Sequence, residues 1–80
     1  MVNNKSLQET TYRTAEINSF LESQSFPYAA SILREKHGAQ PRITATDAAA
    51  FFKSYFMDVN QAQYMFRKMQ TVVAGHMELL

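Results

Sequence analysis

The chain has 80 residues, no cysteine, a formal net charge of +1, 46% hydrophobic residues and 12% aromatic residues. This length suits one small domain, since a domain usually takes roughly 100–200 residues, and the lack of cysteine excludes disulfide bonds, a thiol nucleophile and cysteine-based zinc sites. The near-neutral charge excludes a strongly basic nucleic-acid binder and an acidic mimic, so any partner has to be inferred from local patterns.

Residues 1–10 are mostly polar and lack the apolar stretch of a signal peptide. We therefore expect a flexible N-terminal arm, no export by that route and a cytoplasmic protein. Because no apolar run approaches the ~18 residues of a membrane span, no membrane partner is expected.

From residue 11 onward, apolar residues recur at intervals of three and four, which is the helical period. Residues 11–23 are predicted as a first helix with Thr14 as its N-cap. A second helix is predicted over 27–37, because Pro27 suits a first helical position and Gly38 suits the residue after a helix. The predicted buried residues of these two helices are Ile17, Phe20, Leu21, Ala29, Ile32 and Leu33.

A loop over residues 39–43 leads to the last two predicted helices. Thr44 and Asp47 have the spacing of a capping box, which predicts the start of a third helix. Asp58 and Asn60 are both good caps and predict a fourth helix over 58–74, with Gly75 as its stop. The predicted buried residues of the third helix are Ala48, Phe51, Phe52, Tyr55 and Phe56, and those of the fourth are Ala62, Phe66, Met69 and Val73, with Met65 and Val72 at the edge.

These patterns predict an all-α fold, a small four-helix domain. The domain covers residues 11–75, the arm covers 1–10 and a C-terminal tail covers 76–80. No internal repeat or low-complexity tract is visible.

The sequence shows no grouping of residues that would support catalysis. The two histidines, His37 and His76, lie far apart in the sequence, the carboxylates are dispersed, and no glycine-rich phosphate loop is present. We therefore expect no enzyme activity, no metal site and no cofactor.

The outward side of the fourth helix carries amide, phenol, hydroxyl and basic groups and no acid. Such groups reach base edges and phosphates, and the major groove of a duplex is wide enough for one helix. The residues on this side are Asn60, Gln63, Tyr64, Arg67, Lys68 and Thr71.

Residues 48–69 resemble the second and third helices of helix-turn-helix DNA-binding domains, with a spacing similar to that of small PapI-type fimbrial regulators. The resemblance is carried by Phe51-Phe52, Tyr55 and the run Met57-Asp58-Val59-Asn60-Gln61-Ala62-Gln63-Tyr64. In such domains an apolar residue ends the turn, a small residue follows five positions later, and apolar residues recur four and seven positions beyond it. The matching residues here are Met57, Ala62, Phe66 and Met69.

The resemblance covers about residues 28–75 and implies a helix-turn-helix-like unit in the last two or three helices. The chain departs from the family in two ways. Bulky Phe52 occupies a position that usually holds a small residue, and the turn contains no glycine. The residues after Gly75 are too few for the strand hairpin of a winged helix.

These observations predict a dimeric, sequence-specific DNA-binding transcriptional regulator with helix 58–74 as its recognition helix. Residues 42–74 hold four basic residues against two acidic ones, which favours DNA slightly. A small cysteine-free chain of this kind is typical of a bacterium, plasmid or phage. The expected base contacts are Asn60, Gln61, Gln63, Tyr64 and Arg67, and the expected phosphate contacts are Arg42, Thr44, Lys53 and Lys68.

The alternative is a protein-interaction module, a small inhibitor or adaptor that docks an apolar helical face onto a larger protein. In that case Arg67, Lys68 and Tyr64 are ordinary solvated residues. A small chain buries a low fraction of its surface, so its aromatic residues and methionines favour contact with a partner or a second copy. The expected homodimer interface is the first helix, the third helix or the tail, and the methionines considered are Met57, Met65, Met69 and Met77.

Overall fold

The computed structural model describes residues 8–73 and 76–79. Its elements, in chain order, are β1 (Gln8–Arg13), α1 (Thr14–Ser23), α2 (Pro27–His37), β2 (Arg42–Thr44), α3 (Ala45–Phe56), α4 (Val59–Val72) and β3 (His76–Leu79). The prediction of a small, mainly helical domain with four helices is confirmed. The three strands were not predicted.

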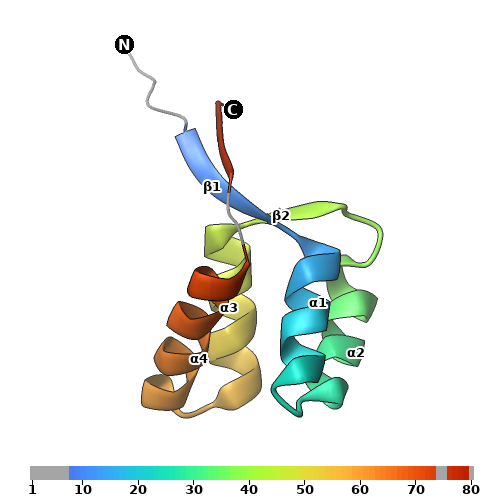
Figure 1. Ribbon diagram of the computed structural model, residues 1–80, viewed down its shortest axis with the longest axis vertical. Helices are drawn as coiled ribbons and strands as arrows, with labels where there is room; N and C mark the ends of the chain where they lie inside the picture. The colour runs from blue at the N-terminus through green and yellow to red at the C-terminus, as the bar shows by residue number, and fades with distance from the viewer. Residues whose placement is uncertain (1–7, 74–75, 80) are drawn as a thin grey trace.

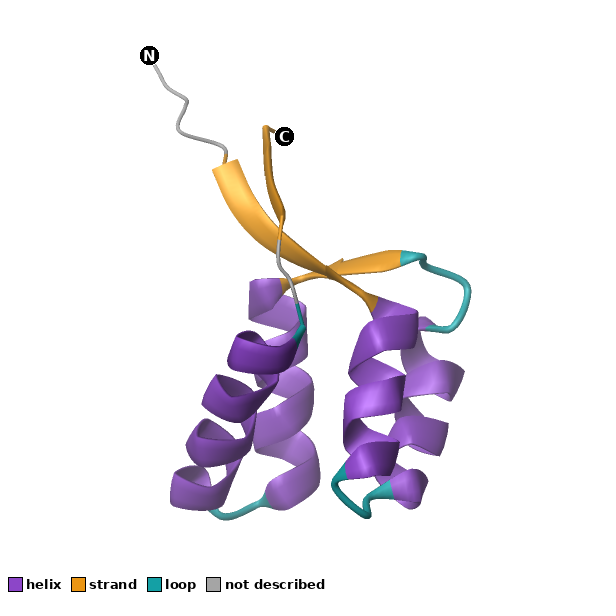
Figure 2. Cartoon of the chain, viewed as in Figure 1, coloured by secondary structure: helices purple, strands orange, loops and turns teal. Residues whose placement is uncertain are grey.

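The strands form one antiparallel sheet in the order β2-β1-β3. The helices form two hairpins, α1 with α2 and α3 with α4, which lie side by side on one side of the sheet (Figures 1 and 2). Within the predicted arm and tail, residues 8–10 and 76–79 are therefore paired strands. Residues 1–7 and 80 of those two segments lie outside the described residues.

The strands cover one end of the helical core. Tyr12 and Ile43 are register partners on β1 and β2, and each is 3% exposed. Because side chains alternate along a strand, Arg13 and Arg42, the next pair in the register, belong to the opposite face of the sheet. The hydroxyl of Tyr12 accepts a hydrogen bond from Gln70 Nε2 at 3.0 Å, which ties β1 to α4.

The first helix begins three residues later than predicted, because the strand β1 continues to Arg13. Thr14 is the first residue of α1 and not its N-cap, so that prediction was wrong. Its hydroxyl donates to the Gln40 carbonyl oxygen at 2.7 Å and its N–H donates to the Pro41 carbonyl oxygen at 3.0 Å. Thr14 thus fastens the loop after α2 to the start of α1.

The second helix has the predicted bounds. Pro27 occupies its first turn and Gly38 follows its last residue, His37. The φ of Gly38 is −62°, so the glycine is not required for a left-handed conformation. A β-carbon at this position would collide with the Arg34 carbonyl oxygen, and this close approach explains the glycine.

The caps of α3 and α4 are the predicted ones. Thr44 Oγ1 accepts a hydrogen bond from the Asp47 N–H at 3.0 Å. Asp58 Oδ1 accepts from the N–H groups of Asn60 and Gln61, at 2.9 and 3.4 Å. Helix α4 ends at Val72, before the predicted end at 74.

One hydrophobic cluster joins all four helices and the sheet. Most of the predicted core residues are buried in it, while Ile32, Tyr55, Phe56 and Phe66 are half-buried at its margin. Val72, predicted at the edge of the stripe, is 65% exposed. The buried members are Tyr12, Ile17, Phe20, Leu21, Ala29, Ala30, Leu33, Ile43, Ala48, Phe51, Phe52, Met65, Met69 and Val73.

Candidate nucleic-acid interface

Helix α4 has two chemically different sides. Its inner side buries Ala62, Met65 and Met69. Phe66 lies at the margin, with its ring centroid 5.6 Å from that of Phe52 and 6.4 Å from that of Tyr12. These contacts fix the rotation of α4 about its axis, so the opposite side has to face solvent.

The outer side of α4 exposes the side chains that were predicted to contact bases. All five are exposed, and α4 itself contains no carboxylate, since Asp58 precedes it as the N-cap. The exposed residues are Asn60, Gln61, Gln63, Tyr64 and Arg67.

Lys68 lies at one edge of this outer side. It is half-buried, and its ammonium nitrogen is 5.7 Å from the centroid of the Tyr64 ring. At this distance the cation is attracted to the face of the ring. The contact holds Lys68 and Tyr64 together on adjacent turns of α4.

Lys53 reaches the other edge of α4 from α3. It lines a shallow groove of about 220 Å³ between the two helices, together with Val59, Gln63 and Phe66. The structure therefore brings Lys53 beside the outer side of α4, as the predicted site requires.

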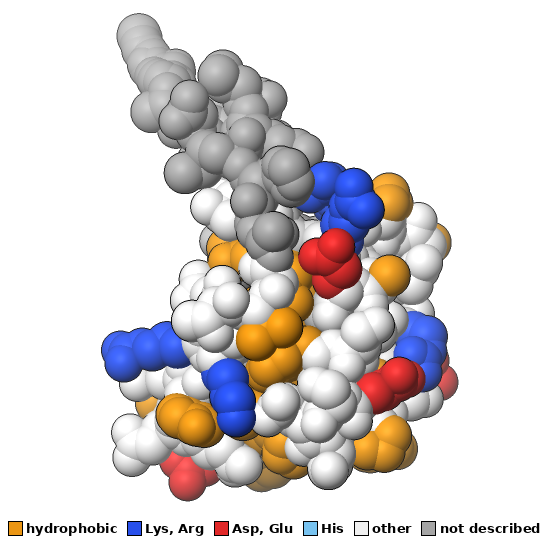
Figure 3. All heavy atoms as spheres, in the orientation of Figure 1, with side chains coloured by type: hydrophobic (Ala, Val, Ile, Leu, Met, Phe, Trp, Pro, Cys, Tyr) orange, Lys and Arg blue, Asp and Glu red, His pale blue; other side chains and the backbone are white. Residues whose placement is uncertain are grey.

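The other two predicted phosphate contacts, Arg42 and Thr44, belong to β2 and not to the α3–α4 hairpin. Thr44 Oγ1 is occupied as the acceptor of the α3 cap, and Arg42 Nη1 donates to Thr11 Oγ1 at 3.4 Å. Figure 3 shows basic side chains over α4, others near the sheet and another beside acidic side chains at the opposite edge of this face. Thus seven of the nine predicted residues lie on the α3–α4 hairpin.

Arg13 is a further candidate for a phosphate contact that was not predicted from the sequence. It is the register partner of Arg42, across the β1–β2 pair. The two arginines are 29 positions apart in the sequence, although they are neighbours in the sheet. No local sequence pattern therefore indicates that they lie close together. Knowledge of the strand register was needed to find it.

The turn between α3 and α4 departs from the helix-turn-helix expectation. Met57, matched to the apolar residue that ends the turn, is 86% exposed and has a left-handed φ of 65°. It therefore contributes no burial to the core. The rings of Phe52 and Phe66 pack against each other between α3 and α4, and Asp58 caps the start of α4.

Within residues 8–73 and 76–79, no three histidine, cysteine, aspartate or glutamate side chains gather in a way that could hold a metal ion. None of the described helices combines the length and the apolar character needed to cross a membrane. Comparisons with models of known protein families, with curated proteins and with solved structures find no match for this chain.

Proposed function

We propose that the protein is a sequence-specific DNA-binding transcriptional regulator that uses α4 as its recognition helix. The observation that carries the proposal is the outer side of α4, where exposed amide, phenol and guanidinium groups are grouped without a carboxylate. A regulator of this kind acts in the cytoplasm of a bacterial cell, where its DNA lies.

The dimensions of α4 support this role. Its 14 residues make a helix about 21 Å long, enough to lie along the major groove. In this proposal Arg67 bonds a guanine, and Asn60 and Gln63 bond adenine edges. Lys53 and Lys68, at the two edges of the helix, would contact the phosphates on either side of the groove.

The proposal includes a homodimer. One α4 contacts few base pairs, and helix-turn-helix proteins gain affinity and length of site by binding two half-sites with two copies. Tyr64 faces the DNA in this proposal, and the other described residues that expose large apolar side chains for dimer contact are Tyr28, Met57, Val59 and Val72.

A salt series tests DNA binding. Fluorescence anisotropy with labelled duplexes of mixed sequence should show affinity that falls as salt rises, with a slope near −0.9 per neutralised phosphate. Arg67→Gln should weaken binding to the preferred duplex by about 1–3 kcal/mol. Lys36→Gln, which removes the same charge from the exposed side of α2, is the matched control and should bind as the parent does.

Absence of binding at low salt would overturn the proposal. So would equal affinity of the Arg67→Gln and Lys36→Gln variants, because the charge lost from α4 would then have no special role.

A protein-interaction module is the second candidate, and the surface between α1 and α4 favours it. A hollow of about 440 Å³ lies there, lined by Phe20, Val72, Val73 and three polar residues of α1. Figure 3 shows hydrophobic side chains reaching the surface between the two hairpins. For this function Val72→Ser would weaken partner binding while Arg67→Gln would not, which is the reverse of the result expected for DNA.

A further inference from the structure

The groove between α3 and α4 has an apolar lining with two polar side chains. Ala62 is buried and Phe66 is half-buried, so these two residues form its floor. A hollow lined mainly by apolar groups, with a few polar groups that orient the ligand, is the usual form of a small-molecule site. The groove holds about 220 Å³, and its lining residues are Ala49, Lys53, Val59, Ala62, Gln63 and Phe66.

The two polar side chains of the groove can both donate hydrogen bonds to a ligand. Within residues 8–73 and 76–79, Lys53 forms no ion pair, and neither Lys53 nor Gln63 forms a side-chain hydrogen bond. Asp58, the nearest carboxylate in the sequence, accepts the hydrogen bonds of the α4 cap. Since Lys53 is the one charged residue of the lining, the groove is complementary to an anion.

The size of the groove limits what can occupy it. Pockets for drug-sized ligands usually measure about 300–1,000 Å³, and this groove is smaller, so it suits a ligand with one ring or a short branched chain. A stable protein–protein interface takes roughly 20–30 residues from each side, whereas six residues line the groove. The occupant that fits is therefore a small molecule.

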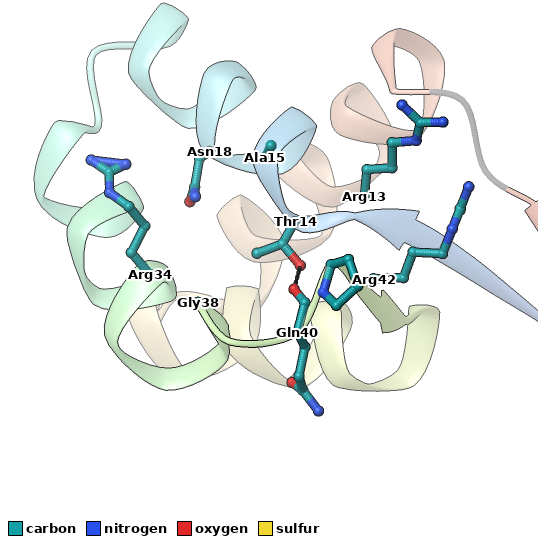
Figure 4. A pocket seen from close by; sticks show the side chains of 9 residues that line it. Arg13, Thr14, Ala15, Asn18, Arg34, Gly38, Gln40 and Arg42 are labelled. Carbon is teal, nitrogen blue, oxygen red and sulfur yellow. Dashed lines mark hydrogen bonds between the residues drawn. The ribbon is translucent and has the colours of Figure 1, made fainter.

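A larger hollow, of about 740 Å³, lies beside Arg13 and Arg42 and lacks this arrangement. Arg34, on its other side, is in an ion pair with Glu22 at 3.2 Å. Figure 4 shows Arg13 and Arg42 extending away from Arg34 and Asn18, so the polar groups of that hollow do not meet around one point. In the groove between α3 and α4, by contrast, a cation and an amide border one apolar floor.

We propose that the groove between α3 and α4 binds a small apolar carboxylic acid, such as an aromatic acid of the size of benzoate. The apolar body lies on Ala62 and Phe66, and the carboxylate accepts hydrogen bonds from the Lys53 ammonium and the Gln63 amide. An alcohol of the same shape makes the apolar contacts without the ionic one.

The proposal has a regulatory step, which rests on the proposed DNA binding. Lys53 is an expected phosphate contact and Gln63 an expected base contact, so a bound acid occupies both groups and its negative charge repels the duplex. The acid is then an effector that lowers the affinity for DNA. Because one phosphate contact is lost, the slope of log K against log salt becomes shallower by about 0.9.

The test of the site is an NMR titration of the full chain with benzoate and with benzyl alcohol, at neutral pH and constant ionic strength. Benzoate should shift the amides of Ala49, Lys53 and Gln63 in a saturable way. Benzyl alcohol should shift the same amides but bind about threefold more weakly, since an ion pair with an exposed lysine adds modestly to the affinity.

Two pairs of variants separate the role of charge from the role of space. Lys53→Gln should abolish the preference for benzoate over benzyl alcohol, whereas Lys36→Gln, the same change on the exposed side of α2, should keep it. Ala49→Leu should block both probes by filling the groove, while Ala50→Leu, at the next exposed position of α3 and outside the groove, should leave both unaffected. All four positions are exposed, so the variants should fold, and thermal melts check this.

Fluorescence anisotropy with a labelled duplex tests the regulatory step. Saturating benzoate should lower the duplex affinity of the parent about threefold or more, relative to acetate at the same ionic strength. The same addition should leave the duplex affinity of Ala49→Leu unchanged, because this variant has no room for the acid.

Three results would overturn the site. These are shifts that rise linearly without saturation, equal binding of benzoate and benzyl alcohol to the parent, and undiminished binding of the probes to Ala49→Leu. Saturable benzoate binding with unchanged duplex affinity would overturn the regulatory step alone. If the protein binds no duplex at all, the proposed DNA binding and the regulatory step both fail, while the titrations with the two probes still decide the site.

Discussion

Met57 has a backbone conformation that suits a residue without a β-carbon. It ends α3 with φ 65°, a left-handed conformation that costs a residue with a β-carbon about 1–2 kcal/mol. The Met57 side chain is 86% exposed, so replacing it with glycine removes little buried apolar surface. We predict that Met57→Gly raises the free energy of unfolding by about 0.5–1 kcal/mol, measured by urea denaturation. Met57→Ala keeps the β-carbon and should stay within about 0.5 kcal/mol of the parent. Equal stability of the two variants would contradict this account.

Asp58 combines a structural role with an electrostatic disadvantage for DNA binding. Its carboxylate caps α4, but it also places a negative charge at the start of the proposed recognition helix. Asp58→Ala should cost about 1 kcal/mol of unfolding free energy, while Asp58→Asn, which retains an accepting oxygen, should cost less than half of that. Asp58→Asn should also raise the affinity for duplex DNA by up to about fivefold. Unchanged or weaker DNA binding in this variant would count against a phosphate near the start of α4.

At the scale of elements, the α3–α4 interface decides how α4 is presented. Phe52 is 1% exposed and contacts both Phe56 and Phe66, whereas Phe66 is half-buried. We predict that Phe52→Ala costs about 3–5 kcal/mol, a large part of the stability of a small domain. Phe66→Ala should cost less, about 1–3 kcal/mol, because part of its ring is already in water. Denaturant melts of the two variants, with Phe52→Leu as a conservative control, measure the difference. A greater loss for Phe66→Ala would show that the interface is centred elsewhere.

At the scale of the whole molecule, the burial of the α3 aromatic residues changes which surface a dimer would use. The aromatic residues of α3 were predicted to be buried and also to favour contact with a partner. They pack within one chain, since Phe51 and Phe52 are buried and Tyr55 and Phe56 are half-buried against Phe26. The exposed apolar residues lie instead on α2, on α4 and in the turn before α4. If these surfaces associate, light scattering should give a mass that rises with concentration toward twice 9.2 kDa. A mass that stays at 9.2 kDa at high concentration would remove the homodimer.

The helices were predictable because their signals are local. Pro27, Gly38, the Thr44–Asp47 pair and Asp58 mark ends within a few residues of chain, and each marks an end or a cap in the structure. The outer side of α4 follows from helical periodicity for the same reason.

The sheet was not predictable in this way. Strand β2 has only three residues, and β1 joins α1 without a break, so neither shows the alternation of a longer strand. The pairing of β1 with β3 joins the two ends of the described chain. The hollow beside Arg13 and Arg42 depends on the register of β1 with β2 and on the loop that Thr14 holds, and therefore it appears only in three dimensions.

The central claim is that α4 is the surface that meets DNA. The most direct measurement is an NMR titration of the full chain with a duplex of mixed sequence, repeated at two salt concentrations. The account predicts that the largest amide shifts fall on α4 between Asn60 and Lys68 and on Lys53, and that they diminish as salt rises. Shifts confined to Tyr28, Met57 and the α1–α4 surface, or no shifts at low salt, would contradict it.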